Sequence, residues 1–224
     1  MARLFASEGV TVIVSGRDAG RGKQTVEAIT SDGGRARFIQ ADLGHIDGVR
    51  RLAEEAGDVD VLVNNAALSV YAPAVEQDPE SFELSFATNV RAPFFLVAQL
   101  APRMVARGSG SIINISSFAA SIATPGLSVY SATKAALNSL TRTWAAEFGS
   151  AGVRVNTIAS GPVRTESVIA AVGEEMAHQI GATTLLGRLA SANEIAEVAL
   201  FLASDRSSYL TGATIAADAG RTAL

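Results

Sequence analysis

The chain has no cysteine among its 224 residues. This excludes a thiol nucleophile, disulfide bonds and thiolate metal ligands. Histidine is almost as scarce, with only His45 and His178. Neither has a second histidine or a nearby carboxylate at the spacing of a metal site, so we do not expect a histidine-based catalytic or metal centre.

The sequence also lacks long apolar segments and a strong net charge. No run of about 18 apolar residues is present, and the first residues have neither the apolar region nor the cleavage site of a signal peptide. The net charge of −4 argues against nucleic acid or an anionic membrane as the main partner. We therefore expect a cytoplasmic protein that binds no nucleic acid and no membrane.

Lysine is rare, since only Lys23 and Lys134 occur among 18 basic residues. Lysine differs from arginine in carrying a compact ammonium whose pKa responds to its surroundings. Lys134 follows Tyr130 by four residues, which places both side chains on one face of a predicted helix. An apolar run ends shortly before them at Ser116 and Ser117. A hydroxyl at a strand end beside a Tyr/Lys pair predicts an acid–base site.

Apolar β-branched runs alternate with helical patterns along the whole chain. The predicted strands cover residues 10–14, 36–40, 59–63, 111–115, 153–158 and 213–217. The predicted helices cover 21–30, 45–56, 79–107, 129–148, 166–180 and 191–203, the last beginning with a capping box at Ser191 and Glu194. This order predicts an α/β fold with a doubly wound parallel sheet covered on both faces. No linker or repeat interrupts it, so we expect a single domain over residues 1–224.

Small and polar residues gather where the predicted strands end. They are Ser15-Gly16-Arg17, Ala41-Asp42, Asn64-Asn65-Ala66-Ala67, Ser116-Ser117 and Ser160-Gly161-Pro162. In open parallel sheets, ligands bind at the carboxyl ends of the strands, near the point where the strand order reverses. We therefore expect these five turns to line one binding crevice.

The ordered set of these motifs resembles the short-chain dehydrogenase/reductase family. The resemblance rests on the Asn64-Asn65-Ala66 turn, Asn89, Ser117, Tyr130 and Lys134, and on the later Ser160-Gly161 and Tyr209…Asp218 segments. Ser117 precedes Tyr130 by 13 residues, as in the family pattern. The match covers nearly the whole chain. It implies a Rossmann-like domain that interconverts a carbonyl and an alcohol of a small molecule with a nicotinamide cofactor.

The resemblance also assigns roles to four catalytic residues. Tyr130 would be the general acid and base, and Lys134 would lower the pKa of Tyr130 and hold the nicotinamide ribose. Ser117 would hydrogen-bond the substrate oxygen, and Asn89 would seat a water that extends the proton relay. Chemically, a free tyrosine has a pKa near 10, and an adjacent ammonium favours its phenolate. The alternatives are a packing role for Tyr130 and Lys134, strand termination by Ser117 and a helix-kink amide at Asn89.

The turn after the first predicted strand bears on cofactor choice. Gly16 stands where NAD-binding members of the family have aspartate, and Arg17 follows it. Since arginine accommodates a 2′-phosphate, we favour NADP(H), with NAD(H) left open by Asp18 and Arg21. Asp42 and Leu43 would line the adenine, and Val163 and Thr165 would hold the carboxamide. The residues assigned to the cofactor are Arg17, Asp42, Leu43, Asn65, Ala66, Tyr130, Lys134, Gly161, Val163 and Thr165.

One part of the family pattern is not found. The family begins with a strand and a turn of the form G-x-x-x-G-x-G that binds the pyrophosphate, whereas residues 1–9 resemble the later half of the helix that follows it. Gly16, Gly20 and Gly22 match the spacing, but the 48 residues from Gly16 to Asn64 suit the adenine-ribose turn instead. We expect the first strand and its turn to be absent. The alternative function is therefore an impaired or inactive relative that acts as a scaffold or partner subunit.

The helices predicted at 79–107 and 129–148 carry more apolar side chains than one sheet face requires. The surplus comprises Phe94, Phe95, Leu96, Trp144 and Phe148. It favours a helix–helix interface between copies of the chain. A dimer or tetramer is also what the resemblance implies.

Overall fold

The computed structural model describes residues 1–223 and alternates strands with helices as the sequence predicts. The strands are β1 (Thr11–Gly16), β2 (Arg35–Gln40), β3 (Val61–Asn64), β4 (Gly110–Ser117), β5 (Val153–Ser160), β6 (Val163–Arg164), β7 (Ala190–Ser191) and β8 (Thr214–Ala217). The helices are α1 (Ala2–Ser7), α2 (Ala19–Ser31), α3 (Ile46–Ala56), α4 (Pro79–Phe86), α5 (Ala92–Arg107), α6 (Ser128–Phe148), α7 (Glu166–Ala182) and α8 (Ala192–Ala203). The capping box predicted at Ser191 and Glu194 is confirmed at the start of α8.

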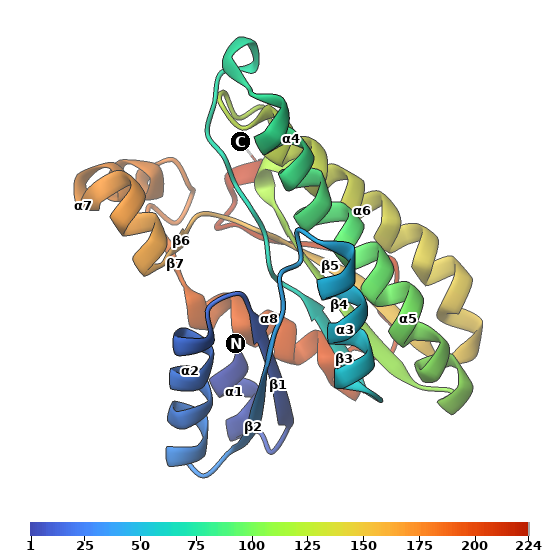
Figure 1. The fold of residues 1–224 in the computed structure, drawn as a ribbon. Helices are drawn as coiled ribbons and strands as arrows, with labels where there is room; N and C mark the ends of the chain where they lie inside the picture. Colours follow the sequence, from blue (N-terminus) through green and yellow to red (C-terminus); the bar gives the residue numbers. More distant parts are fainter. Residues whose placement is uncertain (224) are drawn as a thin grey trace.

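Every strand pair is parallel. β3, β4, β5 and β8 form one sheet in that order, β1 pairs with β2, and the short β6 pairs with β7. The fold is thus a Rossmann-like α/β arrangement, in which α3, α5 and α6 cover one face and α1, α2 and α8 the other (Figure 1). Because parallel strands end on the same side of a sheet, the polar turns after β3, β4 and β5 lie along one edge.

Between residues 1 and 223, no ladder of hydrogen bonds joins β1 to β3. The two strands nevertheless contact the same apolar cores. Val12 and Val61 pack on one cluster, and Ile13 and Leu62 pack on another, on the opposite face. Since side chains alternate between faces along a strand, β1 and β3 lie in one layer. This is the position at which the resemblance places a further strand.

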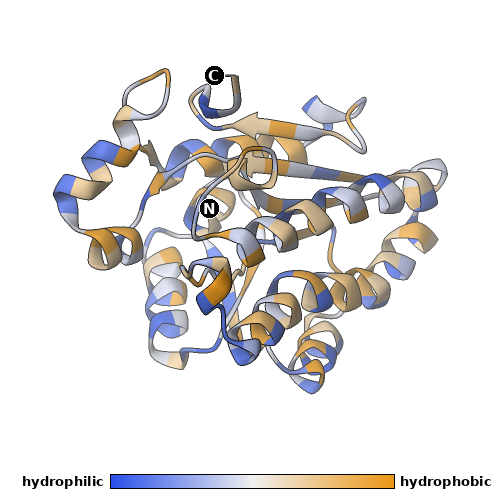
Figure 2. Cartoon of the chain, turned by 90° about the horizontal axis from the view of Figure 1, so that it is seen from above, coloured by the Kyte–Doolittle hydropathy of each residue, from blue (hydrophilic) through white to orange (hydrophobic). Residues whose placement is uncertain are grey.

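The core lies between the strands and their covering helices. Met104, Ile112, Leu137 and Val153 fill the space between the four-stranded sheet and the α5/α6 pair. Trp144 and Leu96, both expected at an interface between copies, are buried in the core instead, at 4% and 5% exposure. The helices accordingly show apolar and polar stripes (Figure 2).

The long helix predicted over 79–107 is interrupted. α4 and α5 are separated by a π-helical turn, Ala87–Arg91, that contains Asn89. Pro93 lies four residues after Asn89 and has no N–H, so the carbonyl of Asn89 lacks its α-helical donor. The π-helical turn thus includes Asn89, a residue of the predicted site. Turns of this kind are frequent at functional sites.

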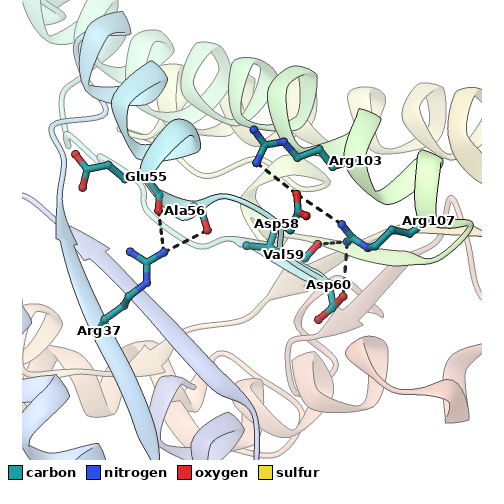
Figure 3. A network of polar contacts seen from close by, with 8 residues as sticks. All are labelled: Arg37, Glu55, Ala56, Asp58, Val59, Asp60, Arg103 and Arg107. Carbon is teal, nitrogen blue, oxygen red and sulfur yellow. Dashed lines mark hydrogen bonds and ion pairs between the residues drawn. The ribbon is translucent and has the colours of Figure 1, made fainter.

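Arginines tie the elements together at the opposite end of the strands (Figure 3). Arg37 of β2 donates to the carbonyls of Glu55 and Ala56 at 2.8 and 3.2 Å, which caps the end of α3. Arg107 of α5 donates to the carbonyl of Val59, just before β3, at 2.6 Å. These contacts fix the helices on the sheet at the end away from the polar turns.

The segment from 163 to 191 stands apart from the layers (Figure 1). It comprises β6, α7 and β7, and α7 is interrupted at Gly173, whose φ is 78°. Arg164 holds Glu174, directly after the interruption, in a two-contact ion pair of 2.8 and 2.6 Å. Within residues 1–223, no helix has the length and apolar character needed to cross a bilayer.

Candidate active site

Tyr130 and Lys134 lie on the face of α6 that is turned toward the sheet. Lys134 is only 2% exposed, and its Nζ donates to the carbonyl of Ile115 in β4 at 2.7 Å. Ser116 of the same strand donates to the carbonyl of Lys134 at 3.2 Å. The ammonium also lies 5.6 Å from the centre of the Tyr130 ring. The predicted pair is therefore held at the carboxyl end of β4.

The pKa values of this pair reflect their burial. Burial raises the pKa of Tyr130 above its ordinary value, and the Ser117 side chain only partly opposes this. The ammonium of Lys134 donates to the Ile115 carbonyl, and burial lowers the pKa of Lys134 itself to about 8. The expected effect of Lys134 on the pKa of Tyr130 stays a prediction. The phenol in this state is thus a neutral proton donor beside a buried amine.

Ser117 ends β4 and is 6% exposed. Its Oγ accepts the backbone N–H of Ala119 at 3.2 Å, which starts the short turn after the strand. The same side chain lowers the pKa of Tyr130, in opposition to the effect of burial. Strand end and helix face thus bring two hydroxyls together, as the sequence predicts.

Asn89 is buried, and its side-chain amide makes hydrogen bonds through both its nitrogen and its oxygen. It accepts the N–H of Leu68 at 2.7 Å and donates to the carbonyl of Leu68 at 2.8 Å. It also donates to the hydroxyl of Thr133 at 3.0 Å, and Thr133 in turn donates to the carbonyl of Tyr130 at 2.7 Å. The side chain thus links the loop after β3 to the helical turn of Tyr130.

A cavity opens at the end of β1. It has a volume of about 250 Å³ and is lined by Arg17, Asp18 and Arg21 among others. Both oxygens of the Asp18 carboxylate are occupied, by the backbone N–H and the guanidinium of Arg21, at 3.0 Å each. These contacts lower the pKa of Asp18. Among residues 1–223, the guanidinium of Arg17 makes no ion pair or hydrogen bond.

The glycines around this cavity do not form a phosphate-binding turn. None of Gly16, Gly20 and Gly22 has a positive φ. A Cβ on Gly22 would lie 2.2 Å from the ring of Phe38, so this glycine allows α2 to pack on β2. The structure thus agrees with the spacing argument, which assigned this stretch to the adenine-ribose turn.

The other residues assigned to the cofactor follow the strand ends. Asp42 accepts the N–H of Gly44 at 2.9 Å after β2, and Leu43 packs on the adjoining core. Asn65 and Ala66 are exposed directly after β3. Gly161 lies against Asp218, where a Cβ would come within 2.5 Å of its Cα. Val163 lies in β6, and Thr165 caps α7 by accepting the N–H of Val168 at 3.2 Å.

The comparisons with known proteins agree with this geometry. A family model described as enoyl-(acyl carrier protein) reductase matches residues 1–222. An uncharacterized oxidoreductase of Thermotoga maritima is 36% identical over 230 residues, which cover 100% of this chain and 92% of the relative. A solved structure described as a short chain dehydrogenase/reductase family protein is 52% identical, with a TM-score of 0.94 over 100% of this chain and 91% of its own.

The chain belongs to the short-chain dehydrogenase/reductase family. A further solved structure with the same fold is a gluconate 5-dehydrogenase of Burkholderia cenocepacia, in complex with NADP and tartrate. It is 28% identical, with a TM-score of 0.92 over 100% of this chain and 89% of its own. The fold predicted from the sequence is thereby shown.

Sequence reasoning missed several polar residues of this short-chain dehydrogenase/reductase. Thr133 carries the link from Asn89 to Tyr130, and Asn114 and Thr141 are both completely buried beneath the site. Asn114 interrupts the apolar run Ile112–Ile115, which is a signal that the sequence does contain. A buried amide requires hydrogen-bond partners, so its presence in a central strand indicates a polar network.

Proposed function

We propose that the chain interconverts a carbonyl and an alcohol of a small molecule with NADP(H) as cofactor, and that Tyr130 is the general acid and base. The observation that carries the proposal is the grouping of Tyr130, Lys134 and Ser117 at one strand end. When bound, the nicotinamide ring supplies the hydride for carbonyl reduction. The chain's own residues then hold the substrate oxygen and move the proton.

In this proposal, Ser117 donates a hydrogen bond to the substrate oxygen and aligns it with the phenol. The raised pKa of Tyr130 keeps its proton in place until the oxygen gains charge. The phenol then releases that proton to the oxygen. Lys134, held by Ile115, stabilises the negative charge that develops on Tyr130 and reaches the ribose of the cofactor. The reverse reaction uses the same groups in the opposite order.

Asn89 contributes through its backbone rather than its side chain in this proposal. The amide group is occupied by Leu68 and Thr133. Its carbonyl lacks an α-helical donor because of Pro93. That carbonyl is therefore the atom of Asn89 suited to hold a relay water.

The preference for NADP(H) rests on the cavity at the end of β1. An NAD-type site needs a carboxylate free to accept the ribose hydroxyls, and the carboxylate of Asp18 is occupied by Arg21. Arg17 lines the same cavity as a cation suited to a 2′-phosphate. NADP-bound relatives, such as the gluconate 5-dehydrogenase of Burkholderia cenocepacia, agree with this preference.

Replacing the phenolic hydroxyl tests the catalytic role. Tyr130→Phe keeps the ring and its packing but removes the transferable proton. We expect NADPH-dependent reduction of a carbonyl substrate to fall by about 10²–10⁴-fold, the range of general acid–base catalysis. The thermal midpoint should change by only a few degrees. Wild-type turnover by this variant would refute the mechanism.

Cofactor preference has its own test at Arg17. Arg17→Ala should weaken NADPH binding about tenfold or more, because one charge-assisted contact to the 2′-phosphate is lost. Binding of NADH, which lacks that phosphate, should change little. Fluorescence titration with both nucleotides measures the difference. Equal losses for NADPH and NADH would contradict the assignment.

The same titration addresses the glycine-rich turn that belongs to the family pattern and is not found in this sequence. We propose that the strand-end residues and Lys134 hold NADPH without such a turn in the space between β1 and β3. Micromolar binding of NADPH to the wild-type chain would refute an inactive scaffold. Absence of binding at millimolar NADPH would refute the oxidoreductase proposal.

A further inference from the structure

A row of buried polar side chains crosses the middle of the four-stranded sheet. Asn64 of β3 pairs with Asn114 of β4, and Asn114 pairs with Thr157 of β5, in the register of the parallel ladders. Residues paired in this way project to the same face of a sheet. Asn114 and Thr157 are fully buried, and Asn64 is nearly so. Central strands of such a sheet are ordinarily apolar on both faces, so buried polar side chains in this position suggest a specific role.

Thr141 of α6, the helix that covers this face of the sheet, contacts two members of the row. Its Oγ1 lies 2.7 Å from both the Nδ2 of Asn114 and the Oγ1 of Thr157. Asn64 completes the row by donating from its Nδ2 to the Oδ1 of Asn114 at 2.8 Å. Four side chains from three strands and one helix are thus joined around a single hydroxyl.

The contact of Thr141 with Leu137 indicates the direction of the other hydrogen bonds in the row. Thr141 donates its own proton to the carbonyl of Leu137 at 2.9 Å. Its oxygen must therefore accept from the amide of Asn114 and from the hydroxyl of Thr157. Asn114 both accepts from Asn64 and donates to Thr141, so it links the two. A fully satisfied buried network of this kind holds its members in one arrangement.

The four elements joined in this way are those that carry the proposed site. β3 continues directly into Asn65, and β4 reaches Ser117 three residues after Asn114. β5 leads to Gly161, and α6 carries Lys134 two helical turns before Thr141. A shift of α6 along its axis would move Tyr130 and Lys134 relative to Ser117 and the turn after β3.

We propose that Thr141 is a positioning residue: through Asn114, Asn64 and Thr157 it sets the position of α6, and hence of the Tyr130 phenol, relative to the strand ends. The proposal rests on the proposed function for its kinetic consequence. Thr141 touches neither substrate nor cofactor in this role. Displacements of about 1 Å at a catalytic group can cost about 10²-fold in rate, so a misplaced helix has a measurable effect.

Three variants of α6 test the proposal. Thr141→Val removes the hydroxyl at nearly constant shape, and Thr141→Ser retains it. Thr143→Val is the matched control, because Thr143 is an exposed threonine of the same helix whose hydroxyl only approaches the carbonyl of Ser139, at 3.4 Å. We expect Thr141→Val to lower kcat about tenfold or more while the KM for NADPH changes less than about threefold. Thr141→Ser and Thr143→Val should retain wild-type kcat.

A second readout does not depend on turnover. Tyrosine labelled with ¹³C at the ring carbon bearing the hydroxyl reports the titration of Tyr130 by NMR, with Tyr130→Phe identifying its signal. The Tyr130 titration should shift in Thr141→Val and return to the wild-type position in Thr141→Ser. If the wild type reduces no carbonyl, the proposed function fails, and this titration still decides the role of Thr141.

The opposing outcome is a purely structural role. Thr141→Val would then lower the thermal midpoint while kcat and the Tyr130 titration match those of Thr143→Val, and the proposal would be overturned. If Thr141→Val does not fold, Asn64→Ala removes only the outermost bond of the row. A smaller change of kcat and titration in the same direction supports the proposal, and no change in either overturns it.

Discussion

Lys134 combines complete burial with a single strong hydrogen bond, and this sets its chemistry. Burial disfavours the charged form, so the pKa of Lys134 falls from 10.5 to about 8. The ammonium is still the main form at neutral pH, where it can stabilise charge on Tyr130. Above pH 8 the amine becomes neutral and loses that ability. We therefore expect the site to be most active below about pH 8.

A pH series tests this reading of Lys134. The kcat/KM for carbonyl reduction should fall as pH rises through about 8, because the ammonium is lost there. Steady-state rates in buffers from pH 6 to 10, at constant ionic strength, measure the profile. A profile that stays flat to pH 9.5 would show that the charge of Lys134 does not matter.

The same pKa shift affects stability in the opposite direction to activity: activity should fall as pH rises, whereas stability should increase. Between about pH 8 and 10.5, the unfolded chain holds the lysine proton and the folded chain does not. The free energy of unfolding therefore gains a contribution from Lys134 as pH rises through this window. Lys134→Met lacks this contribution. Chemical denaturation of both proteins at pH 7 and 10 should show wild type gaining relative to the variant.

At the scale of elements, close approach of α2 to β2 depends on Gly22. A Cβ at this position would lie 2.2 to 2.5 Å from three ring carbons of Phe38. We expect Gly22→Ala to lower the free energy of unfolding by about 1–3 kcal/mol, the usual cost of overpacking. Gly16→Ala is the control, because open space surrounds that position. Denaturant titration measures both.

A compensating change sharpens the same prediction. Phe38→Leu shortens the side chain that Gly22→Ala would strike. The double variant should therefore recover part of the stability lost by Gly22→Ala. Losses that simply add would mean that Gly22 and Phe38 do not oppose each other.

The element scale also shows what the helix prediction did not contain. Residues 79–107 are helical throughout, as predicted. The structure inserts a π-helical turn at 87–91 because Pro93 offers no N–H to the carbonyl of Asn89. The amide of Asn89 then pairs with the backbone of Leu68, 21 residues away. Periodicity cannot reveal such a partner.

At the scale of the whole molecule, the neighbouring rings of Phe94 and Phe95 form an exposed aromatic patch on α5. They are 42% and 40% exposed, their ring centres lie 5.3 Å apart, and Phe94 contacts the buried Trp144 of α6 at 6.1 Å between ring centres. Exposed aromatic groups of this kind mark contact surfaces. We propose that copies of the chain associate through this face.

Light scattering after size exclusion tests the association. The wild type should have a mass that is a multiple of 23.1 kDa. Phe94→Glu combined with Phe95→Glu should yield the monomer, because two charges would be buried at the interface. Val75→Glu, at a 94% exposed position outside the patch, is the control. A monomeric wild type would refute the proposal.

Much of the molecule could be predicted from local patterns. The order of strands and helices, the polar strand ends and the pairing of Tyr130 with Lys134 all follow from periodicities of two and 3.6 residues. The engaged side chain of Asn89, the raised pKa of Tyr130 and the partner of Lys134 could not be predicted. Each depends on how deeply a group is buried and on a contact with a distant segment.

The sequence by itself therefore determined which chemical groups reach one edge of the sheet: a phenol, an ammonium and a serine hydroxyl. Only the tertiary structure decided what state those groups are in. It directs the ammonium of Lys134 to the Ile115 carbonyl, and it joins α6 to three strands through Thr141. The physical reason is that side-chain periodicity is local, whereas desolvation and hydrogen-bond geometry depend on segments that are distant in the chain.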